Sequence, residues 1–217
     1  MIDAIVFDLD GVLIDSETVW NEARCGLVAE QGGRWRPEAQ RAMMGMSATE
    51  WSAYIHDELG VALSPAEISA AVVARLKERY RVNVPLISGA RDAVLGLAAR
   101  WPLALASSAN REIIDLVLER AAMVACFAVT VSSEEVPHGK PAPDVYLEAA
   151  RRLGTLPTRC AAVEDSTSGL RSAAAAEMTV IAVPNREFPP DADAVALAVA
   201  VLDTIKDVRP QLIDTLR

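Results

Sequence analysis

The stretch AIVFDLDGVLIDSE, residues 4–17, leads from four apolar residues into two aspartates, Asp8 and Asp10, and then to Gly11. A short apolar run is typical of a buried strand, and side chains two positions apart on a strand point to the same side. Burying ionised carboxylates without partners costs several kcal/mol or more. We therefore expect residues from elsewhere in the chain to compensate Asp8 and Asp10 at one site.

The composition is that of a well-packed globular protein, with 52% hydrophobic and 5% aromatic residues in a chain of 217. This length suits one large domain, or a core with a smaller insertion. The net charge of −9 argues against a nucleic-acid partner. The first residues do not resemble a signal peptide, and the apolar stretches are too short to span a bilayer. We expect a cytoplasmic protein without a membrane partner, whose three widely spaced cysteines are reduced thiols.

Predicted strands alternate with predicted helices along most of the chain. Apolar runs predict strands at residues 4–10, 103–108, 128–133, 160–165 and 179–183. Helical spacing of apolar residues predicts helices at residues 89–100, 110–122, 143–154 and 167–178. This alternation predicts an α/β fold with a Rossmann-like, doubly wound parallel sheet. In such sheets ligands bind beyond the carboxyl ends of the strands.

One segment, residues 15–83, has helical patterns but no convincing strand. Within it, Ser64 and Glu67 have the spacing of a capping box at a helix start. We interpret residues 15–85 as an α-helical cap domain inserted after the first strand, with residues 84–89 leading the chain back. The core domain then consists of residues 1–14 and 86–217.

Polar residues also occur at the ends of other predicted strands and in the loops that follow them. Ser107 and Ser108 end the run LALASS, Lys140 lies in the loop HGKPAPDVY, and Glu164 and Asp165 end CAAVED. Each feature alone is common in helix caps and surface loops. Together at one edge of a sheet, the acids supply the oxygen ligands that Mg²⁺ prefers. The lysine and hydroxyls supply donors for a phosphoryl group, so the sequence predicts phosphoryl transfer.

Four motifs in this order resemble those of the haloacid dehalogenase superfamily: DLDGVLIDSE, the serine after LALA, GKPAPDVY and EDSTSG. The resemblance covers almost the whole chain. It is closest to the phosphatase-like branch with a helical cap, which includes β-phosphoglucomutase-like and phosphoglycolate phosphatase-like hydrolases. It implies a Mg²⁺-dependent phosphatase that hydrolyses a small phosphomonoester, such as a sugar phosphate, through an aspartyl phosphate.

The resemblance also implies roles for single residues. Asp8 is the implied nucleophile, and Asp10 the implied acid that protonates the leaving group and then activates water. Ser107 and Lys140 are the implied ligands of the phosphoryl oxygens, with Ser108 as a further candidate.

The implied metal ligands are Asp8, the backbone carbonyl of Asp10, and Asp165, with Glu164 binding Mg²⁺ directly or through water. The expected partner is a small phosphorylated metabolite. The sequence leaves the oligomeric state open and favours a monomer. Candidate residues of the cap for substrate choice are Trp20, Arg24, Met44, Met46, Trp51 and His56.

Three alternatives remain at this point. A sugar phosphomutase of the same family typically has an arginine in the loop where Ala48 and Thr49 stand, and a histidine where Trp20 stands. A receiver-like signalling domain is shorter, and its phosphorylated aspartate lies on a later strand. A catalytically silent binding module is disfavoured because every motif residue is present.

Overall fold

The computed structural model describes residues 1–216 and contains a six-stranded parallel sheet with the order β3-β2-β1-β4-β5-β6. The strands are β1 (Ala4–Phe7), β2 (Leu103–Ser107), β3 (Val129–Ser132), β4 (Cys160–Glu164), β5 (Thr179–Ala182) and β6 (Ala200–Val201). β1 lies inside the sheet and pairs in parallel with β2 and β4. The α/β fold class is confirmed, and a strand lies within each of the five predicted ranges. β6, of only two residues, was not predicted.

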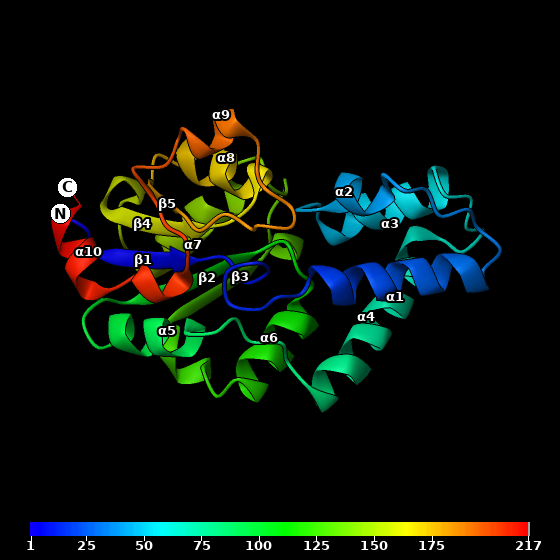
Figure 1. The fold of residues 1–217 in the computed structure, drawn as a ribbon, viewed down its shortest axis with the longest axis horizontal. Helices are drawn as coiled ribbons and strands as arrows, with labels where there is room; N and C mark the ends of the chain where they lie inside the picture. Colours follow the sequence, from blue (N-terminus) through cyan, green and yellow to red (C-terminus); the bar gives the residue numbers. More distant parts are fainter. Residues whose placement is uncertain (217) are drawn as a thin grey trace.

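Helices cover both faces of this sheet (Figure 1). α5 (Ala90–Ala98) and α6 (Arg111–Arg120) pack on one face, where Ile5 and Phe7 of β1 join their core. α7 (Asp144–Leu153) and α8 (Thr167–Ala175) pack on the other face, against Ala4 and Val6. Alternate residues of the buried strand thus serve two cores. The short helices α9 (Ala192–Val195) and α10 (Pro210–Thr215) follow near the carboxyl terminus.

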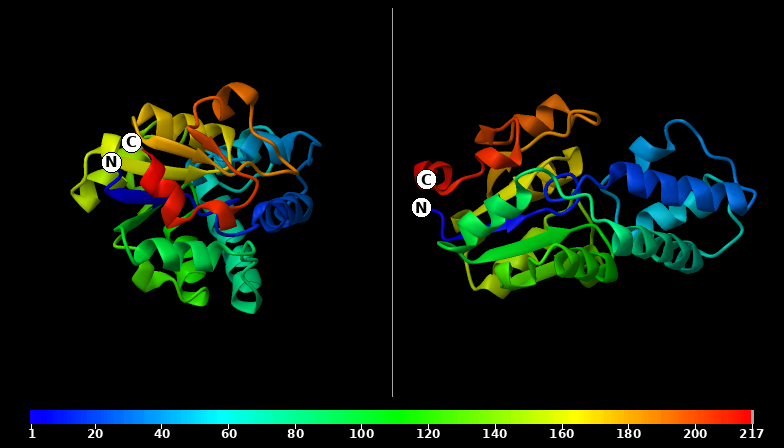
Figure 2. Two further views of the ribbon diagram at one scale, coloured as in Figure 1. Left: turned by 60° about the vertical axis from the view of Figure 1, so that its left-hand side comes forward. Right: turned by 60° about the horizontal axis from the view of Figure 1, so that its bottom comes forward.

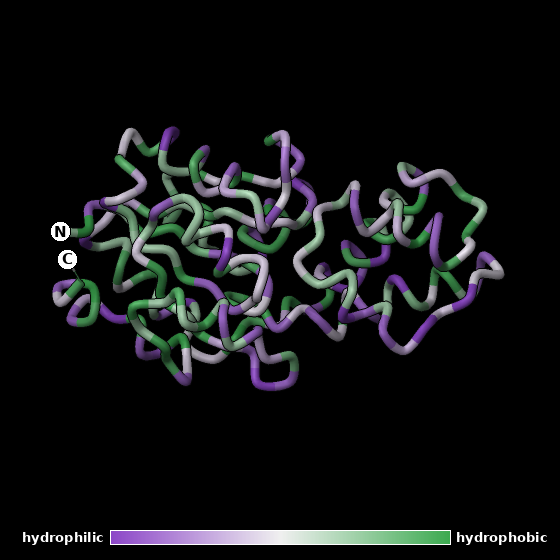
Figure 3. Tube along the Cα trace, turned by 90° about the horizontal axis from the view of Figure 1, so that it is seen from above, coloured by the Kyte–Doolittle hydropathy of each residue, from purple (hydrophilic) through white to green (hydrophobic). Residues whose placement is uncertain are grey.

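A separate group of helices lies beyond one end of the sheet, and both chain termini lie at the opposite end (Figures 1 and 2). It consists of α1 (Glu17–Glu30), α2 (Ala39–Met43), α3 (Ala48–Asp57) and α4 (Pro65–Val82). No strand occurs in residues 15–83, all of which the structure describes, as predicted. The predicted capping box of Ser64 and Glu67 begins α4. Hydrophobic segments run through the sheet, while many outer turns are hydrophilic (Figure 3).

The predicted first strand, residues 4–10, is too long, because β1 ends at Phe7. Asp8 still donates its N–H to the carbonyl of Val163 on β4, at 3.0 Å, but the chain then turns. Gly11, with φ of +76°, donates its N–H to the carbonyl of Ile14. Both aspartates therefore lie in the loop after the strand. None of the helices in residues 1–216 has the length and apolar character needed to cross a membrane.

Candidate active site

A small cavity lies between the carboxyl ends of the central strands and the helical group. Its volume is about 50 Å³, which is room for a few water molecules or a group of similar size. The lining residues are Asp8, Asp10, Glu17, Trp20, Arg24, Met43, Met44, Gly45, Met46, Trp51, Ser108, Ala109, Lys140, Asp165 and Ser166. The cavity therefore combines acids of the core, one lysine and side chains of α1 to α3.

Lys140 is the buried cation on the core side of the cavity and is only 4% exposed. Its Nζ donates to Oδ1 of Asp8 at 2.7 Å, to Oε1 of Glu164 at 2.6 Å and to the carbonyl of Ala106 at 3.1 Å. Burial alone disfavours the ammonium, but the charges of Asp8 and Glu164 outweigh it and raise the pKa of Lys140. Lys140 is therefore charged at neutral pH.

Glu164 has both carboxylate oxygens engaged within the protein. Oε1 accepts from Lys140 and from the hydroxyl of Tyr146 at 2.9 Å. Oε2 accepts from the backbone N–H groups of Asp165 at 2.9 Å and Ser166 at 3.1 Å. Tyr146 was not predicted as a site residue, although a tyrosine on the buried face of a helix usually finds a partner for its hydroxyl. The arrangement holds Glu164 and Lys140 in place together.

Oxygens of three buried acids, Asp8, Glu164 and Asp165, lie within 4.8 Å of one another. Burial and the neighbouring carboxylates raise the pKa of Asp165 well above its ordinary value, although Lys140 opposes this. Burial likewise raises the pKa of Asp8 to about 8, against the effect of Lys140. Within residues 1–216, the Asp165 carboxylate accepts no hydrogen bond. A buried carboxylate without a partner, beside two others, fits the demands of a hard cation such as Mg²⁺.

Gly11 lets the acids approach this closely. A Cβ at position 11 would lie 1.9 Å from Oδ2 of Asp165, and the φ of +76° is one that other residues rarely adopt. The glycine after the two aspartates thus provides a turn and also space for a third carboxylate.

Asp10 is held by the start of α1. Its Oδ1 accepts from Oγ of Ser16 at 2.5 Å and from Nε1 of Trp20 at 2.9 Å. Both bonds use the same oxygen, so the second carboxylate oxygen keeps its capacity for exchange of a proton with a ligand. Ser16 was not predicted as a site residue, since nothing in its spacing distinguishes it from an ordinary helix cap.

The two predicted serines occupy different places. Ser107 is fully buried behind the cavity lining, and its Oγ accepts the N–H of Ala109 at 3.0 Å. Ser108 lines the cavity, and its Oγ donates to the carbonyl of Gly45 in the helical group at 3.0 Å. The structure thus brings five of the seven candidates to the cavity wall, namely Asp8, Asp10, Ser108, Lys140 and Asp165. Ser107 and Glu164 lie immediately behind it.

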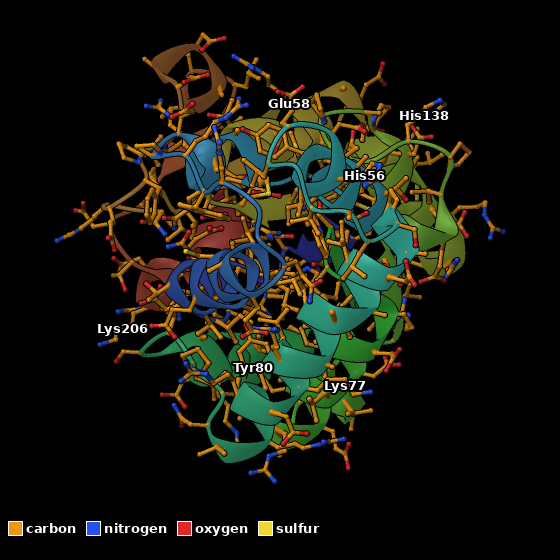
Figure 4. All side chains as sticks on the ribbon, turned by 90° about the vertical axis from the view of Figure 1, so that its right-hand side faces the viewer. His56, Glu58, Lys77, Tyr80, His138 and Lys206 are labelled. Carbon is orange, nitrogen blue, oxygen red and sulfur yellow. The ribbon has the colours of Figure 1, made fainter. Side chains whose placement is uncertain are left out.

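Of the six candidates in the helical group, five line the cavity: Trp20, Arg24, Met44, Met46 and Trp51. His56 is not among the lining residues. It lies in the last turn of α3, where Nδ1 is 2.9 Å from the carbonyl oxygens of Val61 and Leu63 (Figure 4). Its role is therefore local to that end of the helix.

Comparisons with known proteins agree on one family. The sequence matches the haloacid dehalogenase-like hydrolases over residues 2–177. Hexitol phosphatase B of Escherichia coli K12 is 32% identical over 194 residues, which cover 87% of this chain and 86% of that protein. The crystal structure of CbbY from Rhodobacter sphaeroides in complex with phosphate has a TM-score of 0.86 and 25% identity, covering 99% of this chain and 100% of that one. A mutant of CbbY in complex with xylulose-(1,5)bisphosphate has a TM-score of 0.82 and 27% identity, with coverages of 95% and 96%.

Proposed function

The chain belongs to the haloacid dehalogenase-like hydrolases, and we propose that it is a Mg²⁺-dependent phosphatase acting on a small phosphomonoester, such as a sugar phosphate. The observation that carries the proposal is the lining of the cavity. Two aspartates from one loop face the same small space as a buried lysine and a third, unpartnered carboxylate. That space admits a phosphoryl group, and the rest of a metabolite fits once the helical group moves away from the core.

In the proposed first step, a carboxylate oxygen of Asp8 attacks phosphorus, and the bond from phosphorus to the ester oxygen breaks. Lys140 holds Oδ1 of Asp8 at 2.7 Å and therefore orients the nucleophile. Lys140 brings positive charge beside Asp8 for the phosphoryl oxygens, and Ser108 donates to them once its hydroxyl leaves the carbonyl of Gly45. Ser107 stabilises the loop that carries Ser108, because its Oγ accepts a hydrogen bond from the N–H of Ala109.

Asp10 carries the proton in both proposed steps. It protonates the departing ester oxygen, and it then takes a proton from the water that attacks phosphorus of the aspartyl phosphate. The second step breaks the bond from Asp8 to phosphorus and releases inorganic phosphate. Ser16 and Trp20 position Asp10 for these transfers by holding its Oδ1.

Asp8, Asp165 and the backbone carbonyl of Asp10 are the groups that would hold Mg²⁺. When bound, the ion supplies positive charge that stabilises the phosphoryl oxygens and the ionised carboxylates. Both carboxylate oxygens of Glu164 already accept hydrogen bonds within the protein. This supports a role in which Glu164 contacts Mg²⁺ through water and positions Lys140 through their ion pair.

We further propose that residues 15–85 act as a cap domain on a core of residues 1–14 and 86–217. Ser108 contacts Gly45 beside the cavity. Farther away, Lys77 of α4 forms an exposed ion pair with Glu112 of α6, and Figure 4 labels Lys77 on the face of α4 that adjoins α6. Exposed ion pairs contribute about 0–1 kcal/mol. Breaking this one therefore adds little to the free energy of opening the cavity for substrate entry.

The test is release of phosphate from a panel of phosphorylated metabolites, in Mg²⁺ and in EDTA, by the wild-type protein and by Asp8→Asn. We expect activity that requires both Mg²⁺ and Asp8. Equal phosphate release by the wild-type protein and the variant, or full activity in EDTA, would contradict the proposal.

A further inference from the structure

Arg24 of α1 is a buried cation without an acceptor. Its residue is 6% exposed, and its Nε is fully buried without a hydrogen-bond partner. Within residues 1–216 its guanidinium forms no ion pair with a carboxylate. Buried arginines are rare unless they are paired, because removing the charge from water costs several kcal/mol.

Two tryptophans offset part of the free-energy cost of burying the Arg24 charge. The centre of the Arg24 guanidinium lies 4.6 Å from the ring centroid of Trp20 and 5.0 Å from that of Trp51. Such cation–π contacts stabilise the charge, but the Arg24 guanidinium donates no hydrogen bond to an oxygen acceptor within residues 1–216. The two rings therefore hold the Arg24 guanidinium in place, and its hydrogen-bond donors remain available.

The position of Arg24 decides what can use those donors. Arg24, Trp20 and Trp51 line the same small cavity as Asp8 and Lys140. Lys140 and Arg24 are the two basic residues among those lining the cavity, one contributed by the core and one by the helical group. Burial lowers the pKa of Arg24 to about 10, against the effects of Glu17 and Asp10, so it is charged at neutral pH.

We propose that Arg24 binds a second anionic group of the substrate, a carboxylate or a second phosphate, while Lys140 serves the phosphoryl group that is transferred. This inference rests on the proposed phosphatase function and names its substrate class: a phosphomonoester that carries another acid. A planar guanidinium matches a carboxylate or phosphate with two parallel hydrogen bonds. A neutral polyol would leave the buried charge of Arg24 unpaired.

Matched substrate pairs test the proposal without any variant. For the carboxylate, 6-phosphogluconate is compared with glucitol 6-phosphate, which replaces the carboxylate by a hydroxymethyl group. For the second phosphate, glucose 1,6-bisphosphate is compared with glucose 1-phosphate. We expect kcat/KM to favour the anionic member of at least one pair by roughly 10- to 100-fold, the range for hydrogen bonds to charged groups. The pair with the larger ratio identifies which anion is used.

Variants assign the preference to Arg24. Arg24→Gln should abolish the preference in kcat/KM for the anionic member of the pair. Arg24→Lys should keep only part of that preference, because an ammonium lacks the planar arrangement of donors that a guanidinium has. The matched control is Arg75→Gln, which removes a cation of α4 that pairs with Glu30 on the surface. The control should keep the wild-type ratio.

Two outcomes overturn the inference. One is a wild-type protein that hydrolyses both members of each pair equally well, and the other is an Arg24→Gln variant that keeps the wild-type ratio. If neither these compounds nor any other phosphomonoester of the panel is hydrolysed, the phosphatase proposal fails, and calorimetry with the same four compounds decides the role of Arg24. In an Asp8→Asn background the anionic member should bind at least about tenfold more tightly than in Asp8→Asn/Arg24→Gln, and equal affinities refute the role.

Discussion

Replacement of Asp165 by asparagine should stabilise the metal-free protein. The Asp165 carboxylate is buried, accepts no hydrogen bond within residues 1–216, and lies within 4.8 Å of oxygens of Asp8 and Glu164. At that separation and an effective dielectric constant of about 20, each pair of like charges repels by about 3.5 kcal/mol. Lys140 opposes these repulsions and protonation of the acids limits them, so the substitution recovers at most about the repulsion of one pair. A net gain of up to about 3 kcal/mol, reached where the acids are ionised, corresponds to a Tm increase of roughly 6–12 °C for a chain of this size.

The gain should depend on pH. Burial raises the pKa of Asp8 from 3.8 to about 8, and it raises the pKa of Asp165 in the same direction. Between pH 3.8 and about pH 8, the folded state therefore binds more protons than the unfolded state. The free energy of unfolding of the metal-free wild-type protein falls as the pH rises through this range. Asp165→Asn removes one of these groups, so its advantage should be small near pH 5 and largest above pH 8.

Thermal unfolding in EDTA and in Mg²⁺, at several pH values, measures both effects. Mg²⁺ should raise the Tm of the wild-type protein more than that of Asp165→Asn. The control Asp92→Asn removes an exposed acid from the first turn of α5 and should change stability by no more than about 0.5 kcal/mol. A lower Tm for Asp165→Asn than for wild type in EDTA at high pH, or equal stabilisation of both by Mg²⁺, would refute the reasoning.

Three further changes test separate parts of the site. Gly169→Ala would place a Cβ 1.8 Å from Oε1 of Glu164. It should lower the free energy of unfolding, measured in urea, by about 1–3 kcal/mol. The control Gly96→Ala, whose Cβ would have no neighbouring atom within 4 Å, should not lower it. Trp20→Phe keeps an aromatic ring but removes the donor to Asp10, so kcat should fall more for alkyl than for aryl phosphates; an equal fall for both would contradict the positioning role. Replacing residues 42–50, which include four residues of the cavity lining from Met43 to Met46, should redistribute relative kcat/KM across a substrate panel. A uniform decrease would show that this loop does not set specificity.

The sequence predicted those parts of the site that follow from strand order. Asp8, Ser108 and Asp165 come just after parallel strands, and the carboxyl ends of such strands meet at one edge of the sheet. Their convergence could therefore be predicted from the topology alone. The end of β1 at Phe7 could not, because a run of apolar residues does not show where pairing with the neighbouring strands stops.

Other features depend on which side chains meet in space. Arg24 was one of six equivalent candidates in the sequence, and only the contact of Trp20 of α1 with Trp51 of α3 shows that it lies against both rings. Tyr146 has an unremarkable helical position until β4 brings Glu164 to its hydroxyl. The two-residue strand β6 is too short for a hydrophobic period to identify it.

The division of labour between the two aspartates is the central claim, and rapid-quench kinetics of Asp10→Asn with an aryl phosphate tests it most directly. An aryl leaving group needs little protonation, so Asp8 should still be phosphorylated. Hydrolysis of the phosphoenzyme needs the missing base, whose contribution is about 10²–10⁴-fold. We expect Asp10→Asn to release a burst of phenol while phosphate stays trapped on Asp8, and to lose much more activity with alkyl phosphates than with the aryl phosphate. Equal losses on aryl and alkyl substrates, with no burst and no phosphate on Asp8, would contradict it.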